Sequence, residues 1–186
     1  GQLQKMEKND LMRRYGSMGE RLYHLSRGED MRVVSTDDSS KSIGAETTLN
    51  HDVADREELE ALLWAMAQKV SRRAKEQGYG GHTVTLKLKT SDFKLRTRAV
   101  TLEDATQLAH RMYDAVRPLL HRETTGTKFR LIGVALSHLV EMAGGEEATL
   151  DPRLEASTRA EKAIDRIRAK FGKDAVDRGL SLKAKD

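Results

Sequence analysis

The residue types best suited to chemistry in this sequence are Lys and Arg gathered in one stretch. Residues 72–98 hold eight Lys or Arg against two Asp or Glu, although the whole chain carries a net charge of only +4. Such a cluster can bind a polyanion such as a nucleic-acid backbone, because local charge matters more to a polyanion than the total. Charge alone favours the simpler interpretation of a solvated surface, since most basic surface binds nothing specific.

The sequence shows no group of residues spaced for covalent catalysis or for metal binding. The six histidines are scattered, with no pair at the i, i+4 spacing of a helical metal site, and there is no cysteine. The glycine-rich run 78–81 follows an expected helix and precedes an expected strand, which is opposite to the order in a phosphate-binding loop. We therefore predict no catalytic residue, no metal site and no cofactor for this chain.

The elements that would carry the basic stretch begin with a strand over 43–53 and a helix after Asp55. Asp55 and Glu58 have the spacing of a capping box, and an apolar stripe from Leu59 to Ala74 follows at helical spacing. Residues 82–90 alternate apolar and polar side chains, with Thr83, Thr85, Lys87 and Lys89 on the polar side, as in a half-buried strand.

A second strand is expected over 94–102, with Lys94, Arg96 and Arg98 on one side, so the two strands form a basic hairpin. Thr101 or Asp104 is then expected to cap a second helix, and residues 128–140 form the last strand. Strand, helix, strand, strand, helix, strand is the split βαβ order. The sequence thus predicts an α+β fold over 41–140, a four-stranded antiparallel sheet with two helices on one face and a basic open face on the other.

The two ends of the chain differ from this central domain. We expect short helices over 1–27, a linker over 28–40 and a charged, partly helical tail over 141–186, with a peripheral helix from about Leu154 to Phe171. No apolar run approaches the roughly 20 residues of a membrane span. The sequence predicts a cytoplasmic monomer without membrane contact.

Lys41-Ser42-Ile43-Gly44-Ala45-Glu46-Thr47-Thr48 closely resembles the start of the little finger domain of Y-family translesion DNA polymerases of the DNA polymerase IV type. The runs 83–89, 96–98 and 130–134 resemble the strands of the same domain in the same order, and 11–28 resembles the last helices of the thumb. The resemblance implies that the sheet lies in the DNA major groove and contacts phosphates of the template–primer duplex during lesion bypass in DNA repair.

The candidate DNA-binding residues come from two sources. The resemblance implies contacts from the start of the first strand, from the Thr97–Arg98 pair and from Arg130, and we add side chains from charge and alternation. The full set is Lys41, Ser42, Ile43, Gly44, Lys87, Lys89, Lys94, Arg96, Thr97, Arg98 and Arg130.

The resemblance also implies that catalysis belongs to a part of the polymerase that this sequence does not contain. The catalytic carboxylates and their Mg²⁺ ions belong to the family's palm, so this chain is not expected to polymerise alone. DNA template–primer is the expected partner, and a sliding clamp is a further candidate, although 179–183 has no clamp-binding motif. A stand-alone nucleic-acid-binding module and a protein-interaction module using the open sheet remain alternatives.

Overall fold

The computed structural model describes residues 1–32, 41–142, 152–172 and 175–176. The chain divides into two compact units, 1–39 and 40–186. The part of the predicted linker beyond residue 32 lies outside the described residues. Among those described, no helix combines the length and the apolar composition of a membrane span.

The first unit is a small helical cluster made of η1 (Leu3–Lys5), α1 (Lys8–Tyr15) and α2 (Ser17–Ser26). Gly16 joins α1 to α2 at a φ of 58°, a backbone conformation that glycine adopts without strain. A Cβ on Gly19 would lie 2.2 Å from the Leu11 carbonyl oxygen, so glycine permits the close contact between the two helices.

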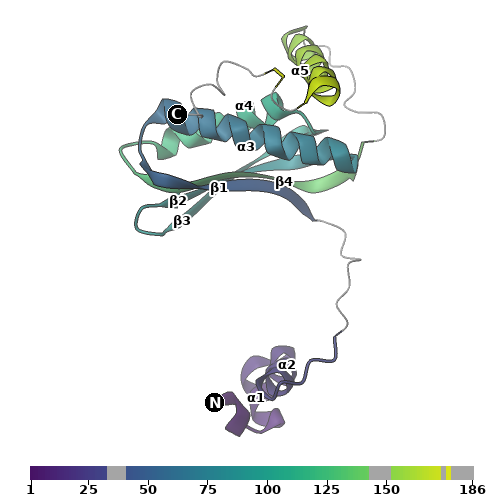
Figure 1. Ribbon diagram of the computed structural model, residues 1–186. Helices are drawn as coiled ribbons and strands as arrows, with labels where there is room; N and C mark the ends of the chain where they lie inside the picture. The colour runs from purple at the N-terminus through teal and green to yellow at the C-terminus, as the bar shows by residue number, and fades with distance from the viewer. Residues whose placement is uncertain (33–40, 143–151, 173–174, 177–186) are drawn as a thin grey trace. The chain divides into compact units, whose positions relative to one another are not determined.

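The second unit contains the predicted α+β fold (Figure 1). Its elements are β1 (Ser42–Val53), α3 (Arg56–Gln77), β2 (Tyr79–Thr90), β3 (Leu95–Thr106), α4 (Ala109–Glu123), β4 (Phe129–Glu141) and α5 (Pro152–Phe171). The four strands are antiparallel in the order β1-β4-β2-β3, with α3 and α4 on one face (Figure 1). The fold class predicted from the sequence is confirmed.

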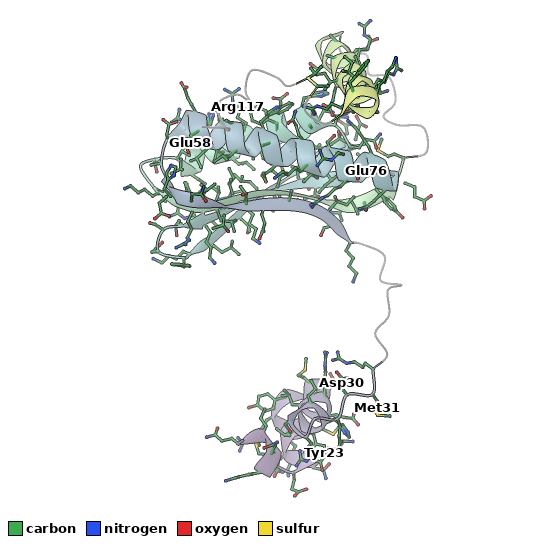
Figure 2. All side chains as sticks on the ribbon, in the orientation of Figure 1. Tyr23, Asp30, Met31, Glu58, Glu76 and Arg117 are labelled. Carbon is green, nitrogen blue, oxygen red and sulfur yellow. The ribbon has the colours of Figure 1, made fainter. Side chains whose placement is uncertain are left out.

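The core lies between the sheet and these two helices. Alternate residues of the central strands, such as Leu86 and Ile132, are fully buried against the apolar stripes of α3 and α4, which include the fully buried Leu63 and Met112. Burial of such side chains from water is the main favourable contribution to folding. Glu58 and Glu76 mark the two ends of α3 in Figure 2, and the side chains on the other sheet face project away from the helices.

The ends of α3 follow the predicted signals, whereas the start of α4 does not. The Asp55 carboxylate accepts a hydrogen bond of 2.8 Å from the Glu58 backbone N–H, and Gly78 ends the helix at a φ of 73°. β3 continues to Thr106, so the prediction that Thr101 or Asp104 caps α4 is wrong. α4 begins at Ala109 and its N-cap residue offers no side-chain hydrogen bond.

Glu161 of α5 supplies the missing cap. Its carboxylate accepts hydrogen bonds from the backbone N–H groups of Ala109 at 2.9 Å and His110 at 3.2 Å, and it contacts His110 Nδ1 at 2.8 Å. Lys75 and Ser71 of α3 donate to the same carboxylate at 2.7 and 3.1 Å. One carboxylate from α5 therefore joins α3 to the N-terminus of α4, where negative charge is stabilising.

α5 lies at the edge of the domain and is attached to it at this carboxylate, a contact that the sequence analysis did not predict. Glu161 is among the buried residues, whereas Phe171 at the end of the helix is 67% exposed. The sequence did not reveal this contact, because acidic and basic residues are equally frequent in the tail and nothing distinguishes Glu161 from its other carboxylates. Burial raises the pKa of Glu161, but the hydrogen bond from His110 and the charge of Lys75 outweigh it and hold the pKa below its ordinary value.

We predict that Glu161→Ala will weaken the docking of α5 by about 3 kcal/mol, because it leaves the backbone N–H groups of Ala109 and His110 without their acceptor and Lys75 with Asp165 alone. Faster amide hydrogen exchange along α5 would report the loss. Since the folded pKa of Glu161 is lowered, its contribution should be complete above about pH 4.5 and decline as the pH falls further.

Glu155→Ala is the matched control, because Glu155 forms only an exposed pair with Arg159 at 3.7 Å. Equal exchange rates in the Glu161→Ala variant and the unmodified chain would contradict a structural role for the buried carboxylate.

Candidate nucleic-acid interface

The sheet face turned away from α3 and α4 is crossed by four rows of side chains. Directly opposed residues of antiparallel strands point to the same side, so the register gives each row. In the order β1, β4, β2, β3, the rows are Ser42, Ser137, Thr83, Thr101; Gly44, Ala135, Thr85, Ala99; Glu46, Gly133, Lys87, Thr97; and Thr48, Leu131, Lys89, Leu95. We call these residues the open face.

The first two rows combine hydroxyl groups with a surface of small side chains. Thr83 Oγ1 lies 3.1 Å from Thr101 Oγ1 and 2.9 Å from His138 Nδ1, which links the hydroxyl row across three strands. The neighbouring row has glycine and two alanines among its four residues. Hydroxyls beside a shallow strip of backbone suit a phosphate chain that approaches closely.

The two glycines of the open face serve different purposes. A Cβ on Gly133 would lie 2.7 Å from the Glu46 Cβ, so glycine is required there by the packing of β1 against β4. A Cβ on Gly44 would meet nothing closer than 3.5 Å, which is ordinary contact. The fold therefore tolerates a larger residue at Gly44, and only a ligand would require glycine.

The structure separates the residues that the sequence grouped into one basic face. Of the candidates, Ser42, Gly44, Lys87, Lys89 and Thr97 lie on the open face. The side chain of Ile43 is buried in the core, so only its backbone is available.

The prediction that Arg96 and Arg98 share a face with the lysines of β2 is wrong. Arg96 opposes Leu88 and Arg98 opposes Leu86, on the helix-covered side of the sheet. The turn between β2 and β3 sets this register, which pairs Lys89 with Leu95.

Glu123, at the end of α4, holds both arginines. Its two carboxylate oxygens lie 2.9 Å from Arg96 Nη1 and 2.6 Å from Arg98 Nη2. The Glu123 side chain is only 9% exposed. Sequence analysis missed this partner because it lies 25 residues from Arg98 in the chain, at the end of a helix.

Carboxylates also accompany two of the lysines. Lys87 pairs with Glu46 at 2.6 Å, and Lys94, in the turn before β3, pairs with Asp92 at 2.8 Å. Hydrogen bonds from Lys94 and Thr90 lower the pKa of Asp92 to about 2, so this carboxylate is charged at neutral pH.

Lys89 and Arg130 differ from the other candidate cations. Within the residues that the structure describes, neither has a carboxylate within 4.0 Å, and both lie against the ring of Phe93. Lys41 is exposed just before β1. Two cations without a carboxylate partner among the described residues thus lie at the β2–β3 turn, an arrangement that the even spacing of Lys and Arg in the sequence does not reveal.

Comparison with known proteins gives the family. The impB/mucB/samB family C-terminal domain matches residues 40–150. This chain belongs to that family. The match covers the whole of the sheet and confirms the resemblance to Y-family DNA polymerases seen at 41–48.

The relatives to which this chain is similar are named as DNA polymerases. The chain is 52% identical to "DNA polymerase IV 1" of Mesorhizobium japonicum over 98% of this chain and 42% of the relative. It is 48% identical to "DNA polymerase IV" of Brucella melitensis, over 98% of this chain and 41% of the relative, and 42% identical to that of Caulobacter vibrioides, over 94% and 43%. The chain therefore spans about two fifths of the length of these relatives.

We predict that Gly133→Ala will destabilise the second unit by about 1–3 kcal/mol, because the added Cβ collides with β1. Gly44→Ala should change the free energy of unfolding by less than about 0.5 kcal/mol. Urea denaturation of the two variants gives both values. Similar losses at the two positions would contradict the register of β1 and β4.

Proposed function

We propose that the open face binds the backbone of a template–primer duplex for a translesion DNA polymerase. The observation that carries the proposal is a row of hydroxyls and a row of small residues on this face, next to the cations Lys89 and Arg130 at the β2–β3 turn. Membership of the impB/mucB/samB family and relatives named DNA polymerase IV support it. By this proposal the chain holds the duplex while damaged template is copied.

The chemistry of the open face favours phosphates over base edges. Lys, Ser and Thr are common phosphate ligands, and sequence readout depends largely on Arg, Asn or Gln directed at bases in the groove. The four rows contain no Asn, Gln or Arg, and Arg130 beside them lies over the ring of Phe93. Binding by this face is therefore expected to follow the DNA backbone and to show no sequence preference.

Nucleotide transfer requires residues beyond those described. Metal-dependent polymerases hold two Mg²⁺ ions with carboxylates, and no group of three or more His, Cys, Asp or Glu in the described part of the chain is arranged for a metal. This part does not fit the Mg²⁺ centre, which we assign to the palm of the polymerase. By this proposal, the described part of the chain holds DNA while the palm carries out catalysis.

The remaining partners are also proposals. We propose that the protein acts as a monomer on DNA in the cytoplasm. A sliding clamp is a candidate partner of the whole polymerase, and residues 179–183 at the end of the tail lie outside the described residues.

We predict that Arg130→Ala will weaken binding to duplex DNA of any sequence. The loss of one phosphate contact should also lower the slope of log K against log salt by about 0.9, because one fewer counterion is released. Fluorescence anisotropy titrations at several salt concentrations measure both quantities. Arg98→Ala should have a smaller effect, because Arg98 already shares Glu123 with Arg96.

Arg166→Ala on α5 is the control, because Arg166 is an exposed cation far along the chain from the sheet. Equal losses from Arg130→Ala and Arg166→Ala would show that the attraction is diffuse and would contradict the open face as the binding site.

A further inference from the structure

The turn between β2 and β3 presents an aromatic ring in an unusual backbone conformation. Phe93 is 60% exposed and has a φ of 65°, in the left-handed region that bulky residues rarely adopt. Hydrogen bonds hold this conformation: Phe93 N–H donates to the Thr90 carbonyl at 2.9 Å, and Lys94 N–H donates to Thr90 Oγ1 at 3.1 Å. Ser91 N–H also donates to the Lys128 carbonyl at 3.0 Å, which ties the turn to the chain just before β4.

Two cations from neighbouring strands lie over this ring. Arg130 of β4 places its Cζ atom 3.9 Å from the ring centre of Phe93, and Lys89 of β2 places its Nζ atom 5.3 Å away. Both distances allow a cation–π attraction. The ring thus lies close to two positive groups from different strands, and its attraction for each opposes their mutual repulsion.

The ring orients these cations without cancelling their charge. The carboxylates that hold Lys87 and Lys94 neutralise them, so those lysines release fewer counterions when a polyanion binds. Phe93 restricts two long side chains and keeps both charges available. Ordering before binding lowers the entropy lost on association, which is a way to gain affinity without a new contact.

We propose that Phe93 is a positioning residue that makes Lys89 and Arg130 a two-cation site for a phosphate of duplex DNA. The proposal rests on the proposed function of the open face and identifies where on it the strongest phosphate contact lies. Arg130 occupies a position over the ring, so Phe93 acts through the cations and does not stack on a base.

Phe93→Leu tests the proposal in the full 186-residue chain with a fluorescein-labelled template–primer duplex. Affinity should fall about threefold to tenfold, because without the cation–π attraction the two cationic side chains are no longer ordered before binding. The salt slope should remain that of the unmodified chain, because both charges are still present. Phe171→Leu is the matched control: Phe171 is 67% exposed and Lys170 lies over its ring at 5.2 Å, so no change in affinity is expected.

A double-mutant cycle separates positioning from direct contact. In a Lys89→Ala/Arg130→Ala background, Phe93→Leu should have no further effect on DNA affinity. An equal loss in both backgrounds would show that Phe93 itself touches the DNA, for example by stacking on a base, and would overturn the proposal. An unchanged affinity of Phe93→Leu in the original background would also overturn it.

Two further measurements keep the test independent of folding and of the proposed function. Phe93→Gly suits a φ of 65° and removes the ring without straining the turn, so it should reproduce the loss seen with leucine. The ring-current shift of the Arg130 side-chain NMR signals should vanish in both variants without DNA.

If the unmodified and Arg130→Ala chains bind DNA equally, the proposed function fails. If Arg130→Ala weakens binding and Phe93→Leu does not, only the positioning role fails.

Discussion

The covering of one sheet face by α3 and α4 dictates the chemistry of the other. A strand places successive side chains on opposite faces, so the residues that pack in the core also determine, through the register, which polar residues stay outside. Val84, Leu86 and Leu88 must be inside, and Lys87 and Lys89 are then outside. The same register turns Arg96 and Arg98 to the helix side, where Glu123 receives them.

Ion pairing then decides which of the surface cations remain available to a polyanion. A cation that already has a carboxylate must exchange that partner for a phosphate, whereas an unpaired cation exchanges only water and mobile ions. Glu46, Asp92 and Glu123 each hold one or two candidate cations. Lys89 and Arg130 are held by the ring of Phe93, which directs them without neutralising them.

A charged side chain with a full set of partners also determines a contact on the helix-covered side of the domain, where Glu161 attaches α5. A buried carboxylate is stable only when donors surround it, and the N-terminus of α4 together with Lys75 and Ser71 supplies them. α5 follows the last strand of the family domain and completes the cap of a helix within it. Glu161 of α5 therefore links the tail helix to the domain, although α5 comes after the last strand in the chain.

The order of strands and helices along the chain, the Asp55 cap and the burial of Val84, Leu86 and Leu88 could all be predicted from the sequence, because they depend on local spacing. The family could be predicted as well, because it depends on short motifs. The tertiary structure alone decided the facing of Arg96 and Arg98, the end of β3 at Thr106, and the docking of Glu161. Each of these depends on the register across a turn or on a partner distant in the chain. Periodicity describes one element at a time, and it carries no information about how two elements are aligned.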